Sequence, residues 1–177
     1  MAGGGIDMER PESVKHYSEI QEKDAHHYPE SSELISIGSP FGKTFGLKRI
    51  GIHHEVLPPG RRTSWPHAES TEEEFVYVIE GQPEVWVDGK LFALMAGDGV
   101  GFPSGTGISR TFINNTEVNV RLLVVGDTNR EDDKIYYPLN ADRIEQVGDR
   151  WWNDVPKHQL GPHDGLPDKL REIQGRQ

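Results

Sequence analysis

The sequence predicts an all-β protein, built as a sandwich or barrel of short strands. Short runs rich in β-branched and aromatic residues follow one another between Leu34 and Gly126. Gly, Pro and Asp-Gly turn signals interrupt these runs at intervals of roughly eight to twelve residues, as in sandwiches and barrels. No helical periodicity alternates with the strands, which argues against a parallel α/β sheet.

Each expected strand is bounded by a turn signal. Pro58-Pro59-Gly60 ends one long run, Glu80-Gly81 ends the most β-prone run, and Asp88-Gly89 is a hairpin signal. The expected strands are, in order, Leu34–Ile37, Leu47–Leu57, Glu74–Ile79, Glu84–Val87, Lys90–Met95, Val100–Phe102, Arg110–Asn114 and Asn119–Val125.

The chain divides by composition into a barrel with an extension at each end. Residues 1–33 are polar and form an N-terminal arm, residues 34–126 hold the strands, and residues 127–177 form a C-terminal extension that wraps the barrel. One short helix is expected near the C-terminus, over Pro167–Gln174. The length of 177 residues suits one domain.

Charge and composition exclude several classes of protein. Lys and Arg number 19 against 29 Asp and Glu, a net charge of −10, so neither nucleic acid nor an anionic membrane is an expected partner. The chain has 0 Cys, which excludes disulfides, zinc–thiolate sites and thiol nucleophiles. Because no apolar run has the roughly 18 residues of a membrane span and no signal-peptide pattern is present, we expect a cytoplasmic protein.

Chemically reactive side chains gather between Pro59 and Gly81. On a strand, residues two apart share a face, so His67 and Glu69 point the same way. Glu74 opens the next strand after a short polar link. If the two strands are neighbours, one imidazole and two carboxylates converge inside the barrel, as a ligand set suited to a divalent transition metal.

Two linked motifs here resemble those of the cupin superfamily, and specifically its small single-domain members. The first runs from Gly60 through His67-Ala68-Glu69 and Glu74 to Gly81, and the second from Gly97 through Pro103-Ser104-Gly105 and Arg110 to Asn114. The resemblance covers about residues 47–126. It implies a double-stranded β-helix (jelly-roll) barrel and a homodimer, and it leaves the function unassigned because cupins serve many functions.

The chain departs from the cupin pattern at two positions. Metal-binding cupins generally use three His and one Glu, and only His67 and Glu74 match that set. Glu69 stands at the second His position and Arg110 at the third. A guanidinium has no lone pair to give a metal, whereas it pairs readily with carboxylates. We therefore expect Arg110 to pair with Glu69 or Glu74 in the space of the metal.

Three hypotheses about function follow from these four residues. In the leading one, His67, Glu69, Glu74 and Arg110 line a pocket for a small polar or acidic molecule, which Arg110 would anchor if acidic. In the second, Arg110 swings away and one divalent transition metal ion binds His67, Glu69 and Glu74 in an oxygenase, isomerase or hydrolase. In the third, a metal-free epimerase or isomerase uses His67 with Glu69 or Glu74 for acid–base chemistry. His67 and Glu74 are the candidate catalytic residues.

Two further features concern the surface of the barrel. Residues 61–65, with Trp65 at their end, either line the barrel mouth or cover hydrophobic surface. If Glu74 faces inward, then Phe75, Tyr77 and Ile79 face outward. Such an apolar stripe needs a cover from the arm, the tail or a second subunit.

Overall fold

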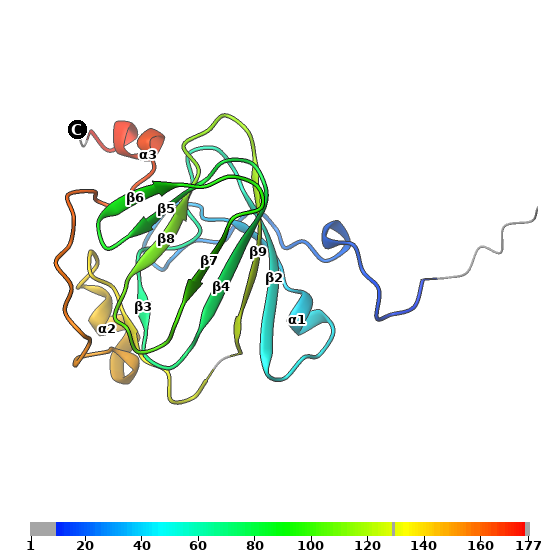
Figure 1. Ribbon diagram of the computed structural model, residues 1–177, viewed down its shortest axis with the longest axis horizontal. Helices are drawn as coiled ribbons and strands as arrows, with labels where there is room; N and C mark the ends of the chain where they lie inside the picture. The colour runs from blue at the N-terminus through cyan, green and yellow to red at the C-terminus, as the bar shows by residue number, and fades with distance from the viewer. Residues whose placement is uncertain (1–9, 129, 176–177) are drawn as a thin grey trace, which may run out of the picture.

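The computed structural model describes residues 10–128 and 130–175, and the strands within them form the predicted jelly-roll of antiparallel sheets (Figure 1). The larger sheet has the order β1 (Ile37–Ser39), β2 (Ile50–Leu57), β9 (Val120–Asp127), β4 (Glu74–Glu80) and β7 (Gly99–Phe102). The smaller sheet has the order β6 (Lys90–Ala93), β5 (Glu84–Val87) and β8 (Arg110–Ile113). A separate pair joins β10 (Ile135–Tyr136) to β3 (Ala68–Glu69).

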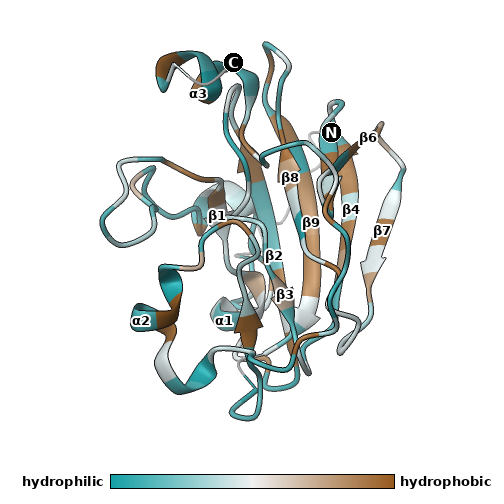
Figure 2. Cartoon of the chain, turned by 90° about the vertical axis from the view of Figure 1, so that its left-hand side faces the viewer, coloured by the Kyte–Doolittle hydropathy of each residue, from teal (hydrophilic) through white to brown (hydrophobic). Residues whose placement is uncertain are grey.

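The hydrophobic core lies between the five-stranded and the three-stranded sheet. Hydrophobic stretches run along the central strands β4 and β9 (Figure 2). Both sheets contribute to one buried cluster, whose members are Leu57, Val76, Val78, Val85, Phe102, Phe112, Val120 and Leu122. Alternation along each strand sends every second side chain into this cluster. The same alternation places Glu74 on the inner face of β4, two residues before Val76.

Most strands fall within a residue or two of the sequence prediction. The first two strands are the exceptions: β1 begins at Ile37, where the predicted segment Leu34–Ile37 ends, and β2 begins at Ile50, three residues after the predicted start at Leu47. The predicted segment Lys90–Met95 is also shortened to Lys90–Ala93. For β1 and β6 the pairing partner decides the length: β1 pairs with residues 54–56 of β2, and β6 with the four residues of β5.

The helices are short. The expected C-terminal helix is present as α3 (Asp168–Ile173), and two further helices, α1 (Phe41–Thr44) and α2 (Arg143–Val147), were not predicted. Segments of four or five residues are too short to show helical periodicity. Two 3₁₀ turns occur at Tyr17–Glu19 and Gly148–Arg150. None of the helices in the described ranges reaches the length and hydrophobicity that crossing a membrane requires.

Both extensions contact the barrel through their described residues. In the N-terminal arm the ring of Tyr17 stacks on His54 of β2, with centroids 4.1 Å apart. On the C-terminal side β10 adds to β3, and the Trp86 indole N–H of β5 donates a hydrogen bond of 2.9 Å to the His163 carbonyl. Figure 1 shows α2 and α1 on opposite sides of the molecule.

The outer face of β4 is apolar, as expected. Phe75, Tyr77 and Ile79 are 45%, 39% and 38% exposed, whereas Val76 and Val78 between them are fully buried. This alternation confirms that Glu74 lies on the inner face.

Asn114 fixes the end of β8, the strand that carries Arg110. Its side-chain amide N–H groups donate to the carbonyls of Leu57 and Val118, each at 2.8 Å, while its side-chain oxygen accepts from the Thr116 backbone N–H at 3.0 Å. Asn114 is 0% exposed, so no water replaces these bonds if the side chain is removed.

We predict that Asn114→Ala lowers the free energy of unfolding by at least about 2 kcal/mol, because it leaves several buried polar groups unpaired. Urea denaturation followed by circular dichroism measures the change. The exposed Asn119 is the matched control, and Asn119→Ala should leave stability unchanged. Equal effects of the two substitutions would contradict this role for Asn114.

Candidate functional site

Backbone pairing brings the two cupin-like motifs together inside the barrel. His67, just before β3, forms an antiparallel bridge with Arg110 at the start of β8. The Arg110 N–H donates to the His67 carbonyl at 3.0 Å, and the His67 N–H donates back at 3.3 Å. Glu69 lies two residues beyond His67 on β3, and Glu74 begins β4.

The strands that carry Glu69 and Glu74 are not neighbours in a sheet. β3 pairs with β10, and β4 pairs with β7 and β9, so the strand holding Glu69 and the strand holding Glu74 are not hydrogen-bonded to each other. Their carboxylates still converge, because both point at Arg110 on β8.

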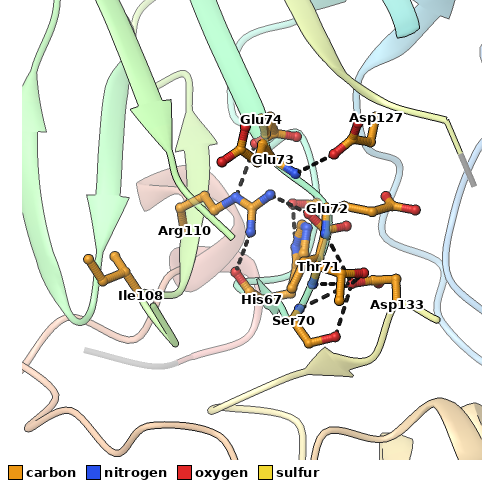
Figure 3. Close-up of polar contacts among 12 residues, drawn as sticks. His67, Ser70, Thr71, Glu72, Glu73, Glu74, Ile108, Arg110, Asp127 and Asp133 are labelled. Atoms are coloured by element: carbon orange, nitrogen blue, oxygen red, sulfur yellow. Dashed lines mark hydrogen bonds and ion pairs between the residues drawn. The ribbon is translucent and has the colours of Figure 1, made fainter. Parts of the chain in front are cut away.

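Arg110 joins the two carboxylates by charge-assisted hydrogen bonds (Figure 3). Its Nη2 donates to Glu69 Oε2 at 2.6 Å, and its Nε donates to Glu74 Oε1 at 3.0 Å. The guanidinium also lies over the Phe102 ring, 5.0 Å from the centroid. Arg110 is only 3% exposed. Burial alone would lower the pKa of Arg110, but Glu74 and Glu69 raise it overall, so the side chain stays charged.

His67 is held as a neutral ring. Its Nδ1 lies 2.8 Å from the Trp65 carbonyl, which can only accept, so Nδ1 carries the proton and Nε2 is the basic atom. Burial lowers the pKa of His67, and the positive charge of Arg110 lowers it further. His67 therefore adds no positive charge at neutral pH.

Glu55 is a site residue that the sequence prediction missed. It lies on the inner face of β2, two residues before Leu57 of the core, and its Oε2 accepts a hydrogen bond of 2.7 Å from Ser36 Oγ. Burial raises the pKa of Glu55 to about 7; the Ser36 bond opposes this shift and the Glu74 charge adds to it. The Glu55 carboxyl group therefore titrates near neutral pH.

One small cavity connects these groups. Its volume is ≈ 90 Å³, room for a few water molecules. The residues that line it are Glu55, Thr63, Ser64, His67, Glu74, Val76, Arg110, Thr111, Phe112 and Val124. Glu69 is not among the lining residues; its carboxylate accepts from Nη2 of Arg110, whereas that of Glu74, which does line the cavity, accepts from Nε.

The residues present do not fit the divalent metal of the cupin pattern. Two of the three candidate ligands, Glu69 and Glu74, direct an oxygen at Arg110, and the buried guanidinium takes the place of a further ligand. A dication there would face a fixed positive charge that cannot be lost.

A second carboxylate cluster lies outside the cavity. Glu69, Glu72 and Asp133 bring one oxygen each within 4.8 Å of one another. Asp133 is 1% exposed, and its Oδ1 accepts from the backbone N–H groups of Ser70, Thr71 and Glu72 at 3.1, 3.0 and 3.3 Å. These bonds hold the link between Glu69 and Glu74 in shape, which is a positioning role that sequence spacing did not indicate.

We predict that Arg110→Ala lowers the free energy of unfolding by about 3–5 kcal/mol, because it leaves two uncompensated carboxylates in the barrel. Adding Glu69→Gln and Glu74→Gln to that variant should recover much of the loss, since the repelling charges are then gone. Arg130, whose ion pair with Asp132 is exposed, is the control: Arg130→Ala should change nothing measurable in the same urea titration. A urea unfolding curve of Arg110→Ala that matches the wild-type curve would contradict the ion-pair account.

Glu55 gives the protein a specific pH dependence. A Glu whose folded pKa is about 7, against an ordinary value of 4.5, stabilises the fold fully below about pH 4.5 and loses that contribution as the pH rises through 7. We therefore predict that the free energy of unfolding of Glu55→Gln, measured relative to that of the wild type, rises by up to about 3 kcal/mol from about pH 5 to about pH 8.

Urea titrations at both pH values give this difference. Glu80, with a side chain 63% exposed, is the matched carboxylate, and Glu80→Gln should track the wild type at both. A Glu55→Gln variant that also tracks the wild type would show that Glu55 has an ordinary pKa.

Comparison with known proteins agrees with this fold and these motifs. The Cupin_2 family model (cupin domain) matches residues 53–126. A sugar phosphate isomerase of the cupin superfamily from Silicibacter pomeroyi is 29% identical, with a TM-score of 0.55 over 58% of this chain and 64% of that one. A putative sugar phosphate isomerase from Acidithiobacillus ferrooxidans shares the fold, with a TM-score of 0.62 at 24% identity over 72% of this chain and 81% of that one.

A curated protein also matches part of the barrel. Polyketide synthase CurC of Streptomyces cyaneus is 46% identical over 62 residues, which are 35% of this chain and 37% of that protein. The match thus spans little more than a third of the relative's length. Together with the jelly-roll and the two linked motifs, the family match shows that residues 53–126 of this chain form a cupin domain.

Proposed function

We propose that the barrel interior binds a small polar molecule through the chain's own hydrogen-bonding groups, without a metal ion. The observation that carries this proposal is Arg110, which holds Glu69 and Glu74 at 2.6 and 3.0 Å in place of a metal. The cavity beside it is lined by hydroxyl groups of Thr63, Ser64 and Thr111 as well as by charged groups.

The charge balance favours a neutral ligand over an acidic one. Glu69 and Glu74 already outnumber the single positive charge of Arg110, the His67 ring is neutral, and Glu55 adds negative charge above about pH 7. An anion would meet a net negative surface. A molecule rich in hydroxyl and carbonyl groups would instead meet donors and acceptors of both kinds.

A second candidate function, metal-free proton transfer, is favoured by Glu55. A carboxyl group with a pKa of about 7 is matched to taking and returning a proton at neutral pH. The Silicibacter relative is named for a sugar phosphate and the Streptomyces relative for polyketides. Both kinds of molecule carry C–H bonds beside a carbonyl group, from which a base can remove a proton.

In this candidate reaction Glu55 breaks the C–H bond. The ionised carboxylate takes the proton, and the bonding electrons pass to the carbonyl oxygen, which becomes an enolate. An N–H of Arg110 stabilises the negative oxygen. The protonated Glu55 then returns the proton to the same carbon while the electrons on the oxygen re-form the carbonyl group, so that both the substrate's bonds and the enzyme are restored.

The test is a thermal-shift screen of neutral sugars and hydroxyketones, with sugar phosphates as the anionic comparison, run with and without EDTA. We predict that at least one compound raises the melting temperature equally in both conditions, because no metal takes part. Glu55→Gln should weaken that shift, whereas Glu80→Gln should keep it. Shifts that appear only with added divalent metal would contradict the proposal.

Deuterium exchange separates the two candidate functions. For a compound that binds, NMR in heavy water shows whether its C–H protons exchange faster with wild-type protein than with Glu55→Gln. Binding without exchange supports the binding function alone, and exchange that Glu55→Gln abolishes supports proton transfer.

A further inference from the structure

Three aromatic side chains from distant segments meet beside His67. Tyr28 comes from the N-terminal arm, Trp65 from the loop before His67, and Tyr137 from just after β10. The rings of Tyr28 and Trp65 stack with centroids 4.4 Å apart, and Tyr137 meets Tyr28 edge-on at 6.2 Å. These three residues are called the aromatic cage below.

The cage holds a cation supplied by the chain itself. Arg143, the first residue of α2, places its guanidinium carbon 5.0 Å from the centre of the Tyr28 ring, 5.1 Å from Tyr137 and 5.7 Å from Trp65. A cation within about 6 Å of an aromatic ring centre is attracted by the ring's π electrons. Three such contacts on one guanidinium make the cage a recognition site for cationic groups.

Arg143 is held differently from the buried arginines of the barrel. Arg62 makes a forked ion pair with Glu33, at 2.6 and 2.8 Å, and Arg110 pairs with two carboxylates. In the part of the chain that the structure describes, no carboxylate lies within ion-pair distance of Arg143. Among residues 10–128 and 130–175, its side chain donates a hydrogen bond only to Gln146 of the same helix.

The fit of Arg143 in the cage is also incomplete. Its Nε is buried without a hydrogen-bond partner, which weakens the hold of the cage on this side chain. The helix that carries it is five residues long and has no buried residue. No buried residue of α2 therefore anchors this helix to the barrel.

The cage adjoins the candidate site. The Trp65 carbonyl is the acceptor for His67 Nδ1 at 2.8 Å, and the Tyr137 ring lies 5.9 Å from the His67 ring. A group bound in the cage would thus lie next to the residues that line the cavity.

We propose that the aromatic cage is a binding site for a planar or alkylated organic cation, such as a guanidinium or methylated ammonium group, and that Arg143 occupies it in the free protein. The ligand's cation replaces Arg143 and releases α2. This site is separate from the polar cavity, and the proposal holds whether or not the interior binds a neutral molecule.

The test uses Arg143→Ala and the probe methylguanidinium, with methylurea as its neutral analogue of the same shape. Binding is followed by tryptophan fluorescence, and the same titration of Trp65→Phe identifies the part of the signal that comes from Trp65. Because the competing side chain is gone, we expect Arg143→Ala to bind methylguanidinium about tenfold more tightly than wild type does. Methylurea should bind to neither protein.

Arg143→Gln keeps a side chain of similar length without the charge and should behave like Arg143→Ala. Arg130→Ala removes an exposed arginine instead and should bind like the wild type. Equal binding of methylguanidinium and methylurea, or no gain in affinity in either Arg143 variant, would overturn the proposal. So would loss of the fold in both Arg143 variants, because Arg143 would then be structural rather than displaceable.

Discussion

The buried ion pairs of Arg110 are the interaction on which the site depends. One guanidinium on β8 holds Glu69 of β3 and Glu74 of β4, two strands that share no backbone hydrogen bonds. Removing charged groups from water is costly, and the arrangement is stable only because each group keeps its partners. The same contacts hold one oxygen of each carboxylate and place a positive charge where a metal would lie, so they determine the chemistry of the cavity as well as its shape.

The remaining groups of the site follow from this charge arrangement. The positive charge of Arg110 helps to keep His67 neutral, and Glu74 helps to keep a proton on Glu55. The cavity therefore holds one neutral base and one carboxyl group that titrates near neutral pH. At ≈ 90 Å³ it is too small for a sugar-sized molecule as it stands, so lining side chains must move to admit one.

The sequence predicted the parts of this structure that depend on local pattern. Turn residues and alternation predicted most of the strands. Motif spacing predicted that Arg110 pairs with Glu69 or Glu74, and the structure pairs it with both. Glu55 was missed because alternation shows which face a residue lies on, whereas its pKa depends on depth and on Ser36, which comes from another segment. The aromatic cage was missed because Tyr28 and Tyr137 lie far apart in the chain and meet only in the fold. The homodimer stays a prediction.

Elemental analysis of the wild-type protein, purified without an affinity tag and compared with Arg110→His, tests the central claim most directly. Our account predicts no stoichiometric transition metal in the wild type, even after incubation with iron, manganese, nickel and zinc. It also predicts metal uptake by Arg110→His, because an imidazole restores the missing ligand and frees both carboxylates. A nearly stoichiometric metal in the wild-type protein would contradict the account, since Arg110 would then not stand in its place.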